Sequence, residues 1–111
     1  MNSEVLINIV HDSDFQSHVI ESVEPVVVIF EKCFWALAQV MSAILEKLAD
    51  KYRGKIRFYK YNLDEHTSIA DYYQIENSTT VLFFKNGNLY TRTGVDSIET
   101  LEKILVSMID G

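Results

Sequence analysis

The fold is decided by one stretch, VVVIFEKCFWALA, which runs from Val26 to Ala38. It opens with four β-branched residues and a phenylalanine, with no polar interruption, which is typical of a strand buried on both faces. After Glu31 the chain turns and enters a long helix. Ligands and chemistry gather at such strand-to-helix junctions, because a helix N-terminus stabilises a thiolate, a phosphate or a carboxylate. We therefore look for function here, although the first helical positions carry no acid, base, thiol or hydroxyl.

The helix after this junction is the most strongly patterned segment of the chain. Its apolar residues recur at steps of three and four and predict one buried stripe. The stripe consists of Leu37, Val40, Met41, Ile44, Leu45, Leu48, Ala49 and Tyr52. Gly54 follows the stripe, as expected for a helix C-cap.

The segments before the central strand are shorter. Residues 6–10 form an apolar strand candidate, and residues 11–14 offer helix caps. Phe15, Val19 and Val23 then fall at i, i+4 and i+8, which predicts one face of a short helix. Pro25, the only proline, ends that helix and fixes the entry into the strand.

The second half of the chain alternates strands and helices before it ends in a hairpin and a helix. The pattern predicts a strand over 56–61, a short helix around 69–73 and a buried strand over 80–84. Asn86-Gly87 is a two-residue hairpin signal, so residues 89–93 should pair back antiparallel. Ser97 caps the last helix. The predicted fold class is therefore α/β, with a central mixed five-stranded sheet flanked by four helices.

Size and charge limit the classes of function. The 111 residues form one domain, 1–111, and 48% hydrophobic residues suffice for a core. A net charge of -6 argues against binding nucleic acid or anionic membrane surfaces. One cysteine cannot form an intrachain disulfide. The first residues are polar, which argues against a signal peptide, and no apolar run is long enough to span a membrane. We therefore expect a cytoplasmic protein.

The pattern of residues resembles the thioredoxin family over nearly the whole chain. The resemblance rests on the following segments: 25–30 (PVVVIF), 43–45 (AIL), 48–55 (LADKYRGK), 60–64 (KYNLD), 73–75 (YQI), 80–87 (TVLFFKNG) and Gly94. Their spacing matches without gaps from Val26 to Gly87. The resemblance implies a single thioredoxin-like domain.

The resemblance also implies that the family's redox site has degenerated here. Thioredoxins carry two cysteines at the start of this helix, and in this chain they align with Trp35 and Ala38. The family's buried aspartate aligns with Ile29, and its cis-proline with Thr79. The degenerate positions are therefore Trp35, Ala36, Leu37, Ala38, Thr79 and Ile29. Of the catalytic surroundings, only Lys60, the lysine neighbour of that aspartate, is retained.

The leading hypothesis is a redox-inactive protein that binds a protein or peptide as a chaperone, assembly factor or scaffold. Aromatic residues favour interface hot spots. The expected partner surface consists of Phe34, Trp35, Tyr73, Ser78 and Thr79. Trp35 is either exposed there or folded back over the helix start. Self-association through this apolar surface is a further alternative.

The runner-up hypothesis is an oxidoreductase that works through Cys33, the only thiol. Cys33 lies two residues before the first catalytic position and precedes the helix, so the helix dipole should help it less. It is therefore either a one-cysteine redox site or an ordinary thiol. His11, His18 and His66 lack metal-ligand spacing, and no glycine-rich phosphate loop is present. We expect no metal and no cofactor.

Overall fold

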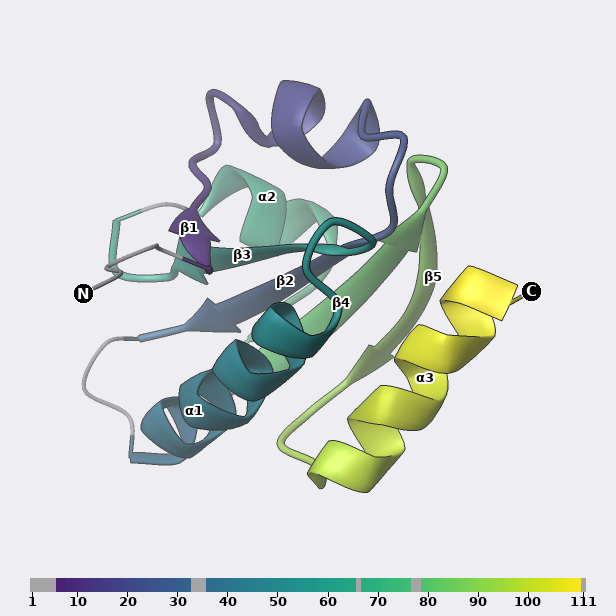
Figure 1. The fold of residues 1–111 in the computed structure, drawn as a ribbon. Coiled ribbons are helices and arrows are strands. Elements are labelled where there is room, and N and C mark those ends of the chain that lie inside the picture. Colours follow the sequence, from purple (N-terminus) through teal and green to yellow (C-terminus); the bar gives the residue numbers. More distant parts are fainter. Residues whose placement is uncertain (1–5, 33–35, 66, 77–78, 111) are drawn as a thin grey trace, which may run out of the picture.

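The structure is a computed structural model that describes residues 6–32, 36–65, 67–76 and 79–110, without the side chains of residues 36–38. Figure 1 shows one sheet with helices on both of its faces. The strands are β1 (Asn8–Ile9), β2 (Val26–Glu31), β3 (Arg57–Asn62), β4 (Thr80–Lys85) and β5 (Asn88–Thr93). The helices are η1 (Gln16–Ile20), α1 (Ala36–Lys51), α2 (Ser68–Tyr72) and α3 (Ile98–Asp110).

The strands form one mixed sheet in the order β1-β3-β2-β4-β5. β3 pairs in parallel with both β1 and β2, whereas β4 pairs antiparallel with β2 and β5. All six residues of β2 are buried, since strands flank it on both sides and helices cover both faces. The expected α/β class and the mixed five-stranded sheet with four helices are confirmed.

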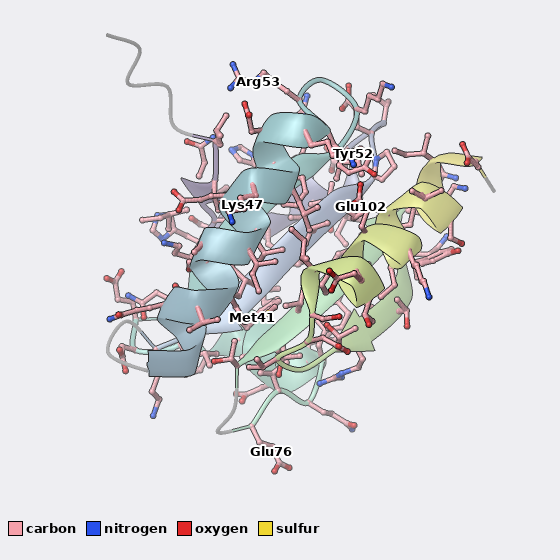
Figure 2. All side chains as sticks on the ribbon, turned by 60° about the horizontal axis from the view of Figure 1, so that its bottom comes forward. Met41, Lys47, Tyr52, Arg53, Glu76 and Glu102 are labelled. Carbon is pink, nitrogen blue, oxygen red and sulfur yellow. The ribbon has the colours of Figure 1, made fainter. Side chains whose placement is uncertain are left out.

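Helices α1 and α3 lie side by side on one face of the sheet (Figure 1). Met41, Leu45 and Leu48 of α1 point into a buried apolar cluster that also contains Leu101 and Leu105 of α3. At the far end of α1, the Tyr52 hydroxyl donates a 2.7 Å hydrogen bond to the Glu102 carboxylate, and Figure 2 shows these two side chains together between the helices.

The opposite face is covered by η1 and α2 (Figure 1). η1 is a single wide turn closed by a bond from the Glu21 amide to the Gln16 carbonyl, 3.0 Å long. Phe15 and Val19 from this turn and Ala70 from α2 pack on a second apolar cluster. The two clusters place the core on both sides of β2.

The hairpin between β4 and β5 forms where Asn86-Gly87 predicts it. Both residues have positive φ, 53° at Asn86 and 80° at Gly87, as a tight two-residue hairpin turn requires. A Cβ atom at Gly87 would lie 2.7 Å from the Ile20 carbonyl oxygen. Glycine is therefore needed here both for its backbone conformation and because the turn packs closely on the end of η1.

Two residues that were predicted to lie on the buried faces of helices are exposed. Val23 is 85% exposed, because η1 ends at Ile20 and the helical period does not reach it. Val40 is 53% exposed, since it lies about 100° around α1 from Met41, at the margin of the buried stripe. The Ser97 cap is confirmed, because its Oγ accepts a 3.2 Å hydrogen bond from the Thr100 amide.

Within the described part of the chain, no helix is both long enough and apolar enough to cross a bilayer.

Candidate functional site

Most of the expected site residues lie between the end of β2 and the start of α1. The residues of the expected site that lie outside the described part of the chain are Cys33, Phe34, Trp35 and Ser78. The backbones of Ala36, Leu37 and Ala38 form the start of α1, while their side chains are also outside the description. The described part of the site therefore consists of the strand end, the rest of α1 and the start of β4.

Ile29, which the resemblance aligns with the family's buried aspartate, is fully buried. It belongs to the apolar cluster that also contains Met41 of α1 and Val81 of β4. An ionised group there would lose its hydration without gaining a partner from these neighbours. The position therefore serves packing and holds no proton.

Thr79, which the resemblance aligns with the family's cis-proline, is buried just before β4. Phe30 pairs with Thr80, so Thr79 lies beside the carboxyl end of β2. No cis peptide bond occurs among the residues that the structure describes, and the bond between Ser78 and Thr79 lies outside them.

Tyr73 is half-buried and lies toward the other end of β4. Its ring packs against Phe15 and Phe84, with centroid separations of 6.1 and 5.5 Å. Phe84 pairs with Val26, at the amino end of β2. The Tyr73 ring therefore packs on the core on the η1 face. It contacts Phe84 at one end of β4, whereas Thr79 precedes the other end of that strand.

A polar cluster that the sequence reasoning missed lies under α1 at the same strand end. Glu31, only 6% exposed, accepts a 3.3 Å hydrogen bond from the Ser42 hydroxyl. The Lys60 ammonium lies 3.7 Å from the other Glu31 oxygen. Burial raises the pKa of the Glu31 carboxyl, while Lys60 and Ser42 partly lower it. These three residues, called the Glu31 cluster below, line a cavity of about 480 Å³ between α1 and the sheet.

The signal for this cluster was present in the sequence. Glu31 ends an otherwise apolar strand, two residues after Ile29, and residues two apart on a strand point to the same face. The lysine that the resemblance retains also lies here, since Lys60 pairs in register with Ile29. The carboxylate that faces this lysine is therefore Glu31, one pleat further along β2 than Ile29.

A second carboxylate, Asp12, lies on the opposite face and is more fully hydrogen-bonded. Its Oδ1 accepts bonds of 2.6 Å from the Tyr61 hydroxyl and 3.3 Å from the Ile69 amide. Its Oδ2 accepts a 3.3 Å bond from the Ser68 amide. Burial and the bond to Asp12 raise the pKa of Tyr61. These contacts tie the segment before η1 to β3 and to the start of α2.

No group of three or more His, Cys, Asp or Glu side chains suited to a metal ion occurs among the described residues.

Comparisons with known proteins place this geometry in a family. The thioredoxin family model matches residues 6–109. Thioredoxin from Acidithiobacillus ferridurans is 34% identical over 101 residues, covering 90% of this chain and 94% of that protein. Mitochondrial thioredoxin from Mus musculus is 33% identical over 103 residues, covering 92% of this chain and 62% of that protein.

A chloroplastic M-type thioredoxin from Spinacia oleracea is 42% identical over 78 residues, covering 70% of this chain. The matched region spans 43% of the spinach protein, so this chain corresponds to about half the length of some of its relatives.

Proposed function

The chain belongs to the thioredoxin family, and from this premise we propose that it binds a protein or peptide partner without dithiol exchange. The carrying observation is the residue content of the aligned redox positions. Two thiols are needed to attack a disulfide and resolve the mixed disulfide, and the chain has one cysteine in total. The aligned positions hold Trp35 and Ala38 instead.

The surroundings of the aligned positions support the same proposal. Ile29 occupies the aspartate position inside an apolar cluster, so no carboxylate stands there to move a proton. Loss of the thiols, the aspartate and the proline together favours a site that no longer carries out exchange, because the aspartate and the proline assist a reaction that the thiols perform.

The intact scaffold supports a retained binding role. The sheet, both apolar clusters and the tight hairpin are all kept. A fold can outlive its original chemistry when its surface still recognises a partner. We place that surface at the carboxyl end of β2, around Phe34, Trp35 and Thr79, and we propose a cytoplasmic chaperone, assembly factor or scaffold.

Partner capture with matched variants tests the proposal. The protein is immobilised with its thiol alkylated, and bound proteins from an extract of the source cells are quantified. We expect Trp35→Ala to lose the specific partners. Tyr90→Ala should keep them, because Tyr90 is an exposed aromatic residue on β5, remote from the strand end where Thr80 pairs with Phe30.

Cys33→Ser separates this proposal from its alternative. A binding protein keeps its partners in this variant, without alkylation. Partners that are lost with Cys33 and released by a reductant would instead support a one-cysteine oxidoreductase. Equal capture by the wild type and Trp35→Ala would contradict the proposed surface.

A further inference from the structure

The cavity beside the Glu31 cluster lies where the parallel strands of the sheet end. Glu31, Lys60 and Asn62 line it from β2 and β3, and Gln39, Ser42 and Glu46 line it from α1. Ligands in open α/β sheets bind at the carboxyl ends of parallel strands. The cavity therefore combines a favourable position, a volume of about 480 Å³ and a largely apolar wall that carries charged, hydroxyl and amide side chains.

Glu31 has unused capacity to accept hydrogen bonds. An ionised carboxylate can accept about four, through two lone pairs on each oxygen. Among the described residues, its donors are the Ser42 hydroxyl at 3.3 Å and the Lys60 ammonium, whose nitrogen at 3.7 Å lies beyond good hydrogen-bond distance. A buried carboxylate with such long contacts is incompletely compensated for its lost hydration.

The charges of the wall select the class of ligand. Two carboxylates, Glu31 and Glu46, face one ammonium, that of Lys60, so the wall carries one excess negative charge. The chain as a whole has a net charge of -6. An anionic ligand would meet both carboxylates, whereas a cation with several N–H groups would complete the coordination of Glu31.

The remaining lining residues fit an organic cation. The side-chain amide oxygen of Gln39 can accept N–H groups. The amide oxygen of Asn62 already accepts a 2.8 Å hydrogen bond from the Asp64 amide and keeps one lone pair for a ligand. Ile9 and Ala43 offer apolar contact to methylene groups. A guanidinium group matches a carboxylate best, because its planar fork of five N–H donors binds bidentately. The Lys60 side chain is 37% exposed, so it has room to move toward solvent when such a group enters.

We propose that this cavity binds a guanidinium group, carried by a small free cation or by an arginine side chain of a partner, through Glu31, Ser42 and Asn62. The site lies at the same strand end as the partner surface around Thr79, but it requires neither thiol chemistry nor the binding role proposed above.

Titration with two probes and a neutral control tests the site. Agmatine represents a free guanidinium ligand, and the capped peptide acetyl-Gly-Arg-Gly-amide represents a partner side chain. The matching citrulline peptide has nearly the same shape without the charge. We expect saturable amide shifts of Ser42, Lys60 and Asn62 in the ¹⁵N NMR spectrum with a guanidinium probe, and binding at least about tenfold weaker with citrulline.

Three variants establish where the probe binds. Glu31→Gln keeps the shape, removes the charge and should weaken binding about tenfold or more. Ala43→Leu should block the cavity without disturbing the fold, because Ala43 is an exposed helical position. Glu76→Gln is the control with the same change of charge, since Glu76 is exposed and is not among the residues that line the cavity. Figure 2 shows its side chain projecting outward from the ribbon.

The pattern of responses identifies the source of the guanidinium. Binding of agmatine alone assigns the site to a free cation, and binding of the peptide alone assigns it to a partner's side chain. The proposal would be overturned if neither probe bound, or if the citrulline peptide bound as tightly as the arginine peptide. It would also be overturned if Glu76→Gln weakened binding as much as Glu31→Gln does.

Discussion

Two carboxylates at the same end of the sheet, one on each face, show how a structural group differs from a candidate binding group. Asp12 accepts bonds from the Tyr61 hydroxyl and from two backbone amides, and it holds three segments together. Glu31 is more deeply buried, yet from the part of the chain that the structure describes it receives only one long hydrogen bond and a loose ion pair. A satisfied buried group stabilises the fold, whereas an under-satisfied one beside a cavity is available to a ligand.

The comparison predicts the largest effect for Asp12→Ala. The change removes the hydrogen bonds that Asp12 accepts from the Tyr61 hydroxyl and from the Ser68 and Ile69 amides, and we expect it to cost about 3 kcal/mol of the free energy of unfolding. Urea denaturation measures it. Asp64→Ala, an exposed control, should cost less than about 0.5 kcal/mol. Equal losses in the two variants would show that Asp12 has no special structural role.

Tyr61→Phe should have an intermediate effect. It removes only the hydroxyl, while the ring keeps its place against Phe30 at a centroid separation of 4.6 Å. A hydrogen bond to a charged acceptor contributes about 2 kcal/mol, so we expect a loss of that size in urea denaturation. If the variant were as stable as the wild type, the Tyr61–Asp12 bond would carry no net stability.

Glu31→Gln should have a small effect of opposite sign. Burial raises the pKa of Glu31 in the folded state, so its ionisation costs stability as the pH rises from the ordinary glutamate range through the raised pKa. The glutamine variant does not titrate, so its free energy of unfolding is expected to equal or exceed that of the wild type above that range.

The measurement for Glu31→Gln is the difference in free energy of unfolding between variant and wild type across pH 4 to 8, a range chosen about the usual glutamate pKa. The difference should grow with pH and then level off. Glu76→Gln should show no such growth. A Glu31→Gln variant that becomes less stable than the wild type as the pH rises would mean that Glu31 is well compensated in the fold.

Lys60→Met should have the smallest effect on stability. It should change the pKa of Glu31 and leave the fold nearly unchanged. The Lys60 ammonium lowers the pKa of Glu31, so its removal should move that pKa further upward. Titration of the Glu31 side-chain carboxyl by ¹³C NMR measures it. An unchanged titration would show that the 3.7 Å pair is too screened to matter.

The sequence predicts the scaffold well, because local patterns specify it. Alternating strands and helices, the Asn86-Gly87 turn and the Ser97 cap each depend on a few neighbouring residues, and each is found in the structure. The errors occur where a pattern was extended too far, as at Val23, which lies beyond the last turn of η1.

The Glu31 cluster could not be assembled from the sequence in the same way. Its members come from β2, α1 and β3. The packing of α1 on the sheet brings Ser42 to Glu31, and the parallel pairing of β2 with β3 brings Lys60 there. A single acidic residue at the end of an apolar strand indicates the face of the sheet on which its side chain lies, but not the residues that it contacts. The surface around Trp35 stays a prediction, since Cys33, Phe34, Trp35 and Ser78 lie outside the described residues.

The most direct test of the central claim, binding without dithiol exchange, is disulfide reductase turnover. Reduction of insulin disulfides by dithiothreitol is followed with the wild type and with Cys33→Ser, at equal protein concentration. We predict no rate above the uncatalysed background for either protein. Turnover by the wild type that disappears in Cys33→Ser would contradict the account and identify Cys33 as the nucleophile of a displaced one-cysteine site.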